Sequence, residues 1–381
     1  MQKDILKNIY LPNLNGLRFI AAALVFICHV ENVEKNFNLP NLADKPFFLI
    51  IGKLGVVIFF VLSGFLISYL MLSEQKETGT LNIKRFYLRR ILRIWPLYFL
   101  IIIFALYIAP HSGFFHLPNC ESALDSNSLF NVSILFFFFL PNQVYAAMGA
   151  VPYAVQTWSV GTEEQFYLLW PLLVKWSKRK GLVFVTVFVA YNVLKLVFIF
   201  FQHKSPVIKT ILDFWYYFNI DCMALGGIGA YLVITQQEKI LRLIYLLPVQ
   251  LLTYAALILL MGFGIEFRYM HFEIYACLYA IAIINLASNK KSILNLENPV
   301  FNYLGKISYG IYMYHFIALT ITIRMLQYFN IYDGALVYLV GFIVTVILSS
   351  LSYHYFESFF LNIKGKLSVF SNKKISNVTS L

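Results

Sequence analysis

Residues 14–30 have the sequence LNGLRFIAAALVFICHV, an apolar run with one arginine near its start and one histidine near its end. Arg18 and His29 are eleven residues apart, which is about 16 Å along a helix that rises about 1.5 Å per residue. Eleven steps of about 100° return to within about 20° of the same helix face. An ionisable side chain inside a membrane span is a functional candidate by default. This stretch therefore predicts a membrane helix with a cation near one surface and an imidazole about half a membrane away.

The composition of the whole chain supports a membrane protein. Hydrophobic residues make up 60% of the sequence and charged residues 13%, and the mean hydropathy is +0.72. An ordinary globular domain has roughly 45–50% apolar and about 25% charged residues. Unbroken apolar runs, such as residues 97–108 and 336–351, are unlike the alternating strands of a membrane β-barrel. We therefore predict an all-α, polytopic helical membrane protein embedded in the lipid bilayer.

Ten transmembrane helices are predicted from the apolar runs. With the N-terminus inside, 21 lysines and arginines fall on the cytoplasmic side and 5 on the outer side, and this bias places both termini in the cytoplasm. The net charge of +12 thus follows from membrane topology, and no nucleic-acid partner is expected. The expected location is the cell (inner or plasma) membrane. The predicted spans are residues 13–30, 50–72, 94–110, 162–176, 181–201, 213–234, 241–262, 272–288, 307–327 and 335–356.

One transmembrane domain is expected over residues 1–360. Residues 361–381 are polar and basic, which predicts a cytoplasmic tail that is partly disordered. A further apolar piece, residues 132–140, is too short to cross a bilayer and predicts a re-entrant or interfacial helix. The sequence leaves the oligomeric state open.

Two arginines at the cytoplasmic start of the third span are candidate ligands for an anion. Arg90 and Arg93 stand at i and i+3, so they share one helix face. Two guanidinium groups there form a fork that suits a phosphate. Basic clusters beside membrane spans are more often topological anchors, and from the residues alone that interpretation is favoured.

Glu163 is the main acidic candidate, within the stretch TWSVGTEEQFYLLWP at residues 157–171. A carboxylate in the first turn of a helix can simply complement the helix dipole, and Glu164 suits that role. Glu163, Tyr167 and Trp170 share a face, however, and enter the membrane from the same side as His29. A carboxylate beside an imidazole can set its tautomer and stabilise its protonated form.

Two further stretches are interpreted first as helix packing. Ser308, Tyr312 and His315 share one face, and a hydrogen-bonded seam between helices is favoured over catalysis there. Residues 59–67 (FFVLSGFLI) suit close packing through small residues. The seven histidines form no HxxxH or HxxH pair and the four cysteines no CxxC motif, so no metal site is expected.

Taken together, these stretches resemble the membrane-bound acyltransferase 3 family, the OafA-type O-acyltransferases. The similarity covers roughly residues 10–360, with five motifs in family order. Family members usually have aspartate where this chain has Asn15, and some carry a hydrolase-like domain after the last span. This chain ends too soon for such a domain, so it is expected to act alone or with a separate partner. The matching motifs are NGLR with His29 at residues 15–29, FFVLSGFLI at 59–67, RRxxRIxP at 89–96, WSVxxExQFY at 158–167 and ISYGIY at 307–312.

The resemblance implies an acyl-CoA donor on the cytoplasmic side, with acetyl-CoA the expected form, and a carbohydrate hydroxyl as acceptor on the outer side. It implies that His29 is the general base or acyl carrier. Arg18, Arg90 and Arg93 become candidates for the CoA phosphates, and Glu163 becomes a catalytic-site residue. Two alternatives stay open. One is a transporter or flippase of a polar solute or acylated glycan precursor. The other keeps the donor chemistry but passes the acyl group to a separate enzyme on the outer face.

Overall fold

Helices make up most of the computed structural model of this chain. The structure describes residues 10–331 and 333–363, and this part contains no β-strand. The predicted all-α class is therefore confirmed. The helices are α1 (Leu14–Asn36), α2 (Pro46–Thr78), α3 (Ile83–Ile103), α4 (Ala123–Ser126), α5 (Leu129–Phe137), α6 (Pro141–Met148), α7 (Trp158–Trp176), α8 (Lys180–Phe201), α9 (Pro206–Trp215), α10 (Ile220–Ile234), α11 (Glu238–Ile244), α12 (Leu247–Gly262), α13 (His271–Ser288), α14 (Pro299–Lys306), α15 (Ser308–Tyr328) and α16 (Gly334–Leu351).

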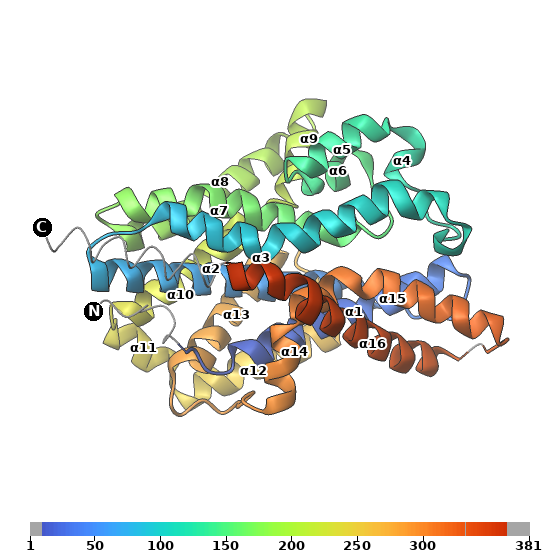
Figure 1. The fold of residues 1–381 in the computed structure, drawn as a ribbon. Helices are drawn as coiled ribbons and strands as arrows, with labels where there is room; N and C mark the ends of the chain where they lie inside the picture. The colour runs from blue at the N-terminus through green and yellow to red at the C-terminus, as the bar shows by residue number, and fades with distance from the viewer. Residues whose placement is uncertain (1–9, 332, 364–381) are drawn as a thin grey trace, which may run out of the picture.

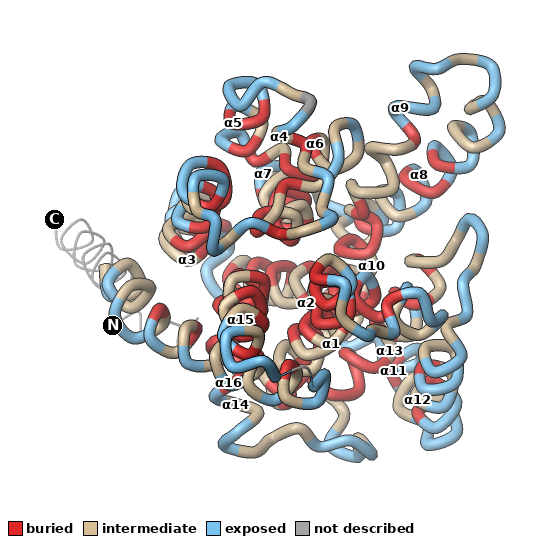
Figure 2. Tube along the Cα trace, turned by 90° about the vertical axis from the view of Figure 1, so that its right-hand side faces the viewer, coloured by how far each residue is buried: buried red, intermediate tan, exposed pale blue. Residues whose placement is uncertain are grey.

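The long helices lie side by side in one bundle (Figure 1). In Figure 2, which looks along the bundle, α3, α7 and α8 lie in an upper group, and α1, α13 and α15 lie in a lower group. Helix α10 joins the two groups, because it packs on α2 and α13 and also on α8. The site described below lies where α1, α2 and α15 face α3 and α7.

Helices α2 and α10 approach each other closely enough to need glycine on both sides. A Cβ atom added to Gly64 would lie 1.9 Å from the carbonyl oxygen of Met223. One added to Gly226 would lie 2.0 Å from the carbonyl oxygen of Val61. Small residues permit such backbone contact between membrane helices. The small-residue packing predicted for residues 59–67 is confirmed at Gly64.

Within the part of the chain that the structure describes, seven helical segments are long and apolar enough to cross a membrane, or eight if the bent pair α11–α12 counts as one span. Two predicted spans, residues 162–176 and 307–327, correspond to α7 and α15, which are not among these segments. Both helices are more polar because they carry side chains that line internal cavities. The count of ten spans and the cytoplasmic placement of the termini therefore stay predictions. The segments are Leu14–Asn36, Pro46–Thr78, Ile83–His111, Lys180–Phe201, Pro206–Ile234, His271–Ser288 and Gly334–Ile363.

The outer surface of the bundle is apolar where it would meet lipid. On α12, Leu252 and Ile258 are each 71% exposed, and Phe200 at the end of α8 is 73% exposed. Side chains of this kind are stable against lipid chains and costly in water. These faces support a membrane protein.

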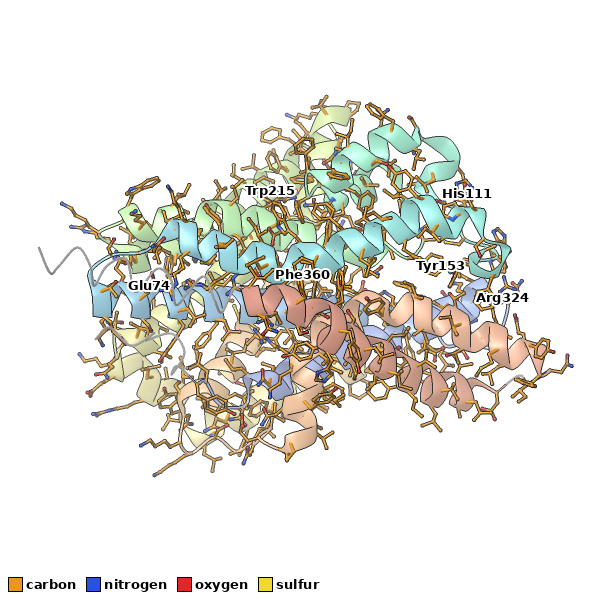
Figure 3. The ribbon with its side chains drawn as sticks, in the orientation of Figure 1. Glu74, His111, Tyr153, Trp215, Arg324 and Phe360 are labelled. Atoms are coloured by element: carbon orange, nitrogen blue, oxygen red, sulfur yellow. The ribbon has the colours of Figure 1, made fainter. Side chains whose placement is uncertain are left out.

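Figure 3 labels Glu74 at one end of the bundle and His111, Tyr153 and Arg324 at the other. We call these the Glu74 end and the Arg324 end. Helix α3 starts at the Glu74 end, where the backbone N–H of Asn82 donates to Oε1 of Glu74 over 3.1 Å. Helix α1 finishes at the Arg324 end, where the guanidinium carbon of Arg324 lies 4.9 Å from the centre of the Phe37 ring. Most of the predicted tail, from residue 364 onward, lies outside the described residues.

Candidate active site

Four of the five predicted site residues, all except His29, line one cavity. Arg18 comes from α1, Arg90 and Arg93 from α3, and Glu163 from α7. The cavity holds about 90 Å³, and we call it the arginine cavity. The three guanidinium groups thus converge on one cavity from two helices that are distant in sequence. The cavity is also lined by Phe59, Ser63, Ile94, Ser159, Val160, Tyr167, Ser308, Tyr309 and Tyr312.

Positive charge dominates this cavity. The guanidinium carbon of Arg90 lies 5.7 Å from the ring centres of both Phe86 and Tyr167, and its Nε atom is buried without a hydrogen-bond partner in the described chain. Within residues 10–331 and 333–363, Arg90, Arg93 and Arg18 form no ion pair within 4.0 Å. The three side chains are half-buried. Cations that are partly withdrawn from water without a partner are costly, so this geometry favours an anionic ligand over a simple topological anchor.

The neighbouring Arg89 differs from these three. Its Nη2 atom lies 3.4 Å from Oε2 of Glu74, in an ion pair at the Glu74 end of the bundle. The arginines of the RRxxR motif thus have two different environments. Arg89 contacts a carboxylate of α2, while Arg90 and Arg93 line the cavity.

Glu163 is held by two hydroxyl groups. The hydroxyl of Ser63 donates to Oε1 over 3.0 Å, and the hydroxyl of Tyr167 donates to Oε2 over 2.5 Å. Helix α7 begins at Trp158, so Glu163 and Glu164 lie beyond its first turn, and the interpretation of Glu164 as a first-turn carboxylate that complements the helix dipole is wrong. Glu164 instead accepts a hydrogen bond from the indole N–H of Trp95 over 3.0 Å.

His29 lies in a second cavity, nearer the Arg324 end, which holds about 170 Å³. Its Nδ1 atom is 2.8 Å from Nε2 of His315 on α15, and the two rings are nearly parallel, at 6°. The ring of Phe316 lies 4.5 Å from the centre of each imidazole. We call this space the histidine cavity. This contact between the two imidazoles therefore fixes the orientation of the His29 ring through its Nδ1 atom.

The predicted contact between Glu163 and His29 is not found. Within the described residues Glu163 bonds to Ser63 and Tyr167 in the arginine cavity, and His29 bonds to His315. Glu163 stands about one and a half turns deeper along α7 than Trp158, which lines the histidine cavity. Glu163 therefore lies among the arginines, and His315 makes the contact with His29 that was expected of Glu163.

Helix α15 contributes more to the two cavities than its sequence predicted. Its polar face forms the predicted hydrogen-bonded seam, since Tyr312 bonds to Gln156 and Ser159, and the same face also lines both cavities. Ser308 lies at the arginine cavity, Tyr312 lies at both, and His315 contacts His29. The available signal was the i, i+4, i+7 spacing of these three residues, which resembles the spacing on α7.

Tyr312 stands where the two cavities adjoin. Its hydroxyl donates to the carbonyl oxygen of Gln156 over 2.7 Å and lies 2.8 Å from the hydroxyl of Ser159. Its ring packs edge-on against Phe59, with 5.7 Å between ring centres. Arg18 in the first cavity and His29 in the second stand about 16 Å apart along the unbroken helix α1. The arrangement can bind an anion at one end and present an imidazole at the other.

The described residues hold no group of three or more histidine, cysteine, aspartate or glutamate side chains arranged for a metal ion.

Comparison with known proteins identifies the family to which the chain belongs. The sequence profile of the acyltransferase 3 family, described as an acyltransferase domain, matches residues 11–354. The chain belongs to this family. All five candidate site residues and His315 fall inside the matched range. The resemblance carried by the five motifs is thereby confirmed.

Curated relatives agree with this assignment. The chain is 25% identical to the peptidoglycan O-acetyltransferase OatA of Listeria monocytogenes, over 92% of this chain and 55% of that protein. It is 26% identical to a putative O-acetyltransferase of Staphylococcus aureus, over 92% of this chain and 57% of that protein. It is 26% identical to the putative peptidoglycan O-acetyltransferase YrhL of Bacillus subtilis, over 91% and 54%. The chain spans about half the length of these relatives. No solved structure matches it.

Proposed function

We propose that this chain is a membrane O-acyltransferase that moves an acyl group from acyl-CoA to a hydroxyl of a cell-surface or periplasmic carbohydrate. Acetyl is the acyl group that the names of the relatives favour. The Glu74 end faces the cytoplasm in this proposal, and both termini are cytoplasmic. One observation carries the proposal, namely that a cavity with three guanidinium groups adjoins a cavity with a fixed imidazole at Tyr312.

Donor binding is assigned to the arginine cavity. Guanidinium groups bind phosphate oxygens in paired hydrogen bonds, and CoA carries a diphosphate and a 3′-phosphate. Arg90 and Arg93 from α3, with Arg18 from α1, supply the positive charge. The pantetheine arm then extends past Tyr312 toward His29. This route brings the thioester across part of the membrane without exposing it to lipid.

His29 is assigned as the general base. A proton on its Nδ1, donated to Nε2 of His315, leaves Nε2 of His29 free to accept the proton of the acceptor hydroxyl. The hydroxyl oxygen attacks the thioester carbonyl, the carbon–sulfur bond breaks, and the sulfur leaves as the CoA thiol with the proton from His29. A variant of this route forms an acyl-His29 intermediate first.

Glu163 has a different role from the one expected of it. Its contacts with Ser63 and Tyr167 place its charge among the arginines, so we assign it to holding the donor site in shape and balancing part of its charge. His315 takes over the orientation of the imidazole. It is a positioning residue, because it acts through His29.

The test uses purified protein in nanodiscs with radiolabelled acetyl-CoA and soluble oligosaccharides. Acceptor-dependent release of the CoA thiol, with label on the sugar, is the expected result. His29→Ala is the matched variant, and normal product formation by it would overturn the assignment of the base. Transfer of label only when a separate outer-face enzyme is added would support the hand-over alternative. Uptake of intact solute into proteoliposomes, without thiol release, would support the transporter instead.

A further inference from the structure

A third and larger cavity lies beside the histidine cavity. It holds about 380 Å³, which is within the roughly 300–1,000 Å³ of small-molecule sites. We call it the vestibule. The two cavities share four lining residues, Lys53, Tyr145, Trp158 and Tyr217. These four side chains therefore form a shared wall between the vestibule and the histidine cavity.

The shared wall is aromatic and firmly held. The ring of Tyr217 packs edge-on against Tyr145 at 4.9 Å and against Trp158 at 5.4 Å. The backbone carbonyl of Tyr217 accepts a hydrogen bond from the hydroxyl of Thr162 over 2.7 Å and another from the amide of Asn142 over 3.4 Å. The wall is thus fixed to both α6 and α7, and it is preorganised to face a flat ligand.

A buried ion pair lies next to Tyr216, a further residue of the vestibule lining. Nζ of Lys195 on α8 lies 2.6 Å from Oε1 of Glu273 on α13, and each side chain is at most 3% exposed. The same Nζ lies 5.2 Å from the ring centre of Tyr216, which lines the vestibule. Charges buried between membrane helices are expensive, and they persist where position matters. This pair ties α8 to α13 beneath Tyr216.

The charged side chains of the vestibule balance one another. Lys53 and Arg268 oppose Asp213 and Glu266, and none of the four forms an ion pair within 4.0 Å among the described residues. A cavity with both donors and acceptors unpaired, and with aromatic walls, suits a ligand with many hydroxyl groups, since each hydroxyl both donates and accepts. It does not suit a fatty acyl chain, and its balanced charge contrasts with the arginine cavity.

We infer that the vestibule is the acceptor subsite and that it binds a sugar ring of a glycan. The ring lies against the aromatic wall, and Asp213 and Glu266 accept hydrogen bonds from its hydroxyls. One hydroxyl of the ring, or of the next sugar, then reaches Nε2 of His29 past Trp158. This inference rests on the proposed function for its catalytic meaning, and on the vestibule alone for the binding of sugar.

The test measures binding and turnover separately. The probes are a β-1,4-linked N-acetylglucosamine tetrasaccharide and maltotetraose, and their binding to wild-type protein in nanodiscs is followed by saturation-transfer NMR. Asp213→Asn and Glu266→Gln are the variants. Each is expected to raise the dissociation constant of a bound probe, and the acceptor KM, about tenfold, the effect of losing a hydrogen bond to a charged group. Affinity for acetyl-CoA is expected to stay unchanged.

A matched control neutralises a carboxylate outside the three cavities. Glu238→Gln suits this purpose because Glu238 pairs with Arg242 at the surface of α11, over 2.9 Å. It is expected to leave sugar binding unchanged. Failure of the wild-type protein to bind either probe, or binding that the Asp213 and Glu266 variants leave intact, would overturn the inference. Sugar binding that these variants weaken, without any acyl transfer, would instead uphold the subsite and reject the proposed function.

Discussion

Nδ1 of His29 lies 2.8 Å from Nε2 of His315, although 286 residues separate the two histidines in the chain. The contact joins α1 to α15 at the cavity where acyl transfer is proposed. It orients the imidazole of His29 with a second imidazole, at the place where the sequence predicted a carboxylate. The two histidines and the arginine cavity lead to four predictions, and the buried pair of Lys195 and Glu273 leads to a fifth.

His29→Ala is expected to reduce acyl transfer by at least 100-fold, because a positioned general base contributes roughly 10²–10⁴-fold to the rate. Release of the CoA thiol in the presence of acceptor measures the effect. The variant should still insert and accumulate, which membrane immunoblotting checks. Near-normal turnover would reject His29 as the base.

His315→Ala is expected to lower kcat by roughly 10- to 100-fold, since loss of orientation misplaces the reacting atoms. The donor KM should change little, because His315 does not line the arginine cavity. His315→Gln, which keeps a hydrogen-bonding group, should recover part of the rate. Equal losses in both variants, with reduced protein yield, would indicate a structural role only.

Arg90→Ala and Arg93→Ala are each expected to raise the donor KM about tenfold or more, the loss of a charge-assisted hydrogen bond to phosphate. Lysine at either position should restore only part of the affinity, because it lacks the paired geometry. Arg89→Ala is the control, since Arg89 pairs with Glu74. Unchanged affinity for acyl-CoA in both cavity variants would support the alternative interpretation, in which these arginines are topological anchors.

Glu163→Gln distinguishes the role that the sequence predicted for Glu163, orienting His29, from the role proposed above, shaping the donor site. Its contacts with Ser63 and Tyr167 predict a change in donor affinity, with the pH dependence of kcat unaltered. A carboxylate acting on His29 would instead shift the pH profile. Steady-state kinetics between pH 5 and pH 9 distinguish the two results, and a shifted profile with unchanged donor KM would contradict our assignment.

Lys195→Met is expected to destabilise the protein by about 3–5 kcal/mol, because it leaves the carboxylate of Glu273 buried without its partner. The temperature of unfolding in detergent measures the loss. Pairing it with Glu273→Gln should recover much of the stability, since both charges are then removed. A double variant no more stable than Lys195→Met alone would show that the two residues are not coupled.

Local sequence pattern was enough for features that lie within one helix. The apolar run at residues 14–30 identified α1, and its periodicity placed Arg18 and His29 on one face about 16 Å apart. The i, i+3 spacing of Arg90 and Arg93 correctly put them side by side at one cavity. Composition predicted the helical class and the apolar exterior. These properties depend on helix geometry and on transfer of side chains into lipid, and both act residue by residue.

Features that depend on which helix faces meet were decided only by the tertiary structure. Periodicity showed that α1, α7 and α15 each have a polar face, but every pairing of those faces was compatible with the sequence. Packing put His315 against His29 and Glu163 among the arginines, because α15 lies beside α1 while α7 faces α3. In a bilayer, helices of similar hydropathy can exchange neighbours at little cost. Close contacts such as Gly64 on Met223 select one arrangement, and that selection brings the polar faces together.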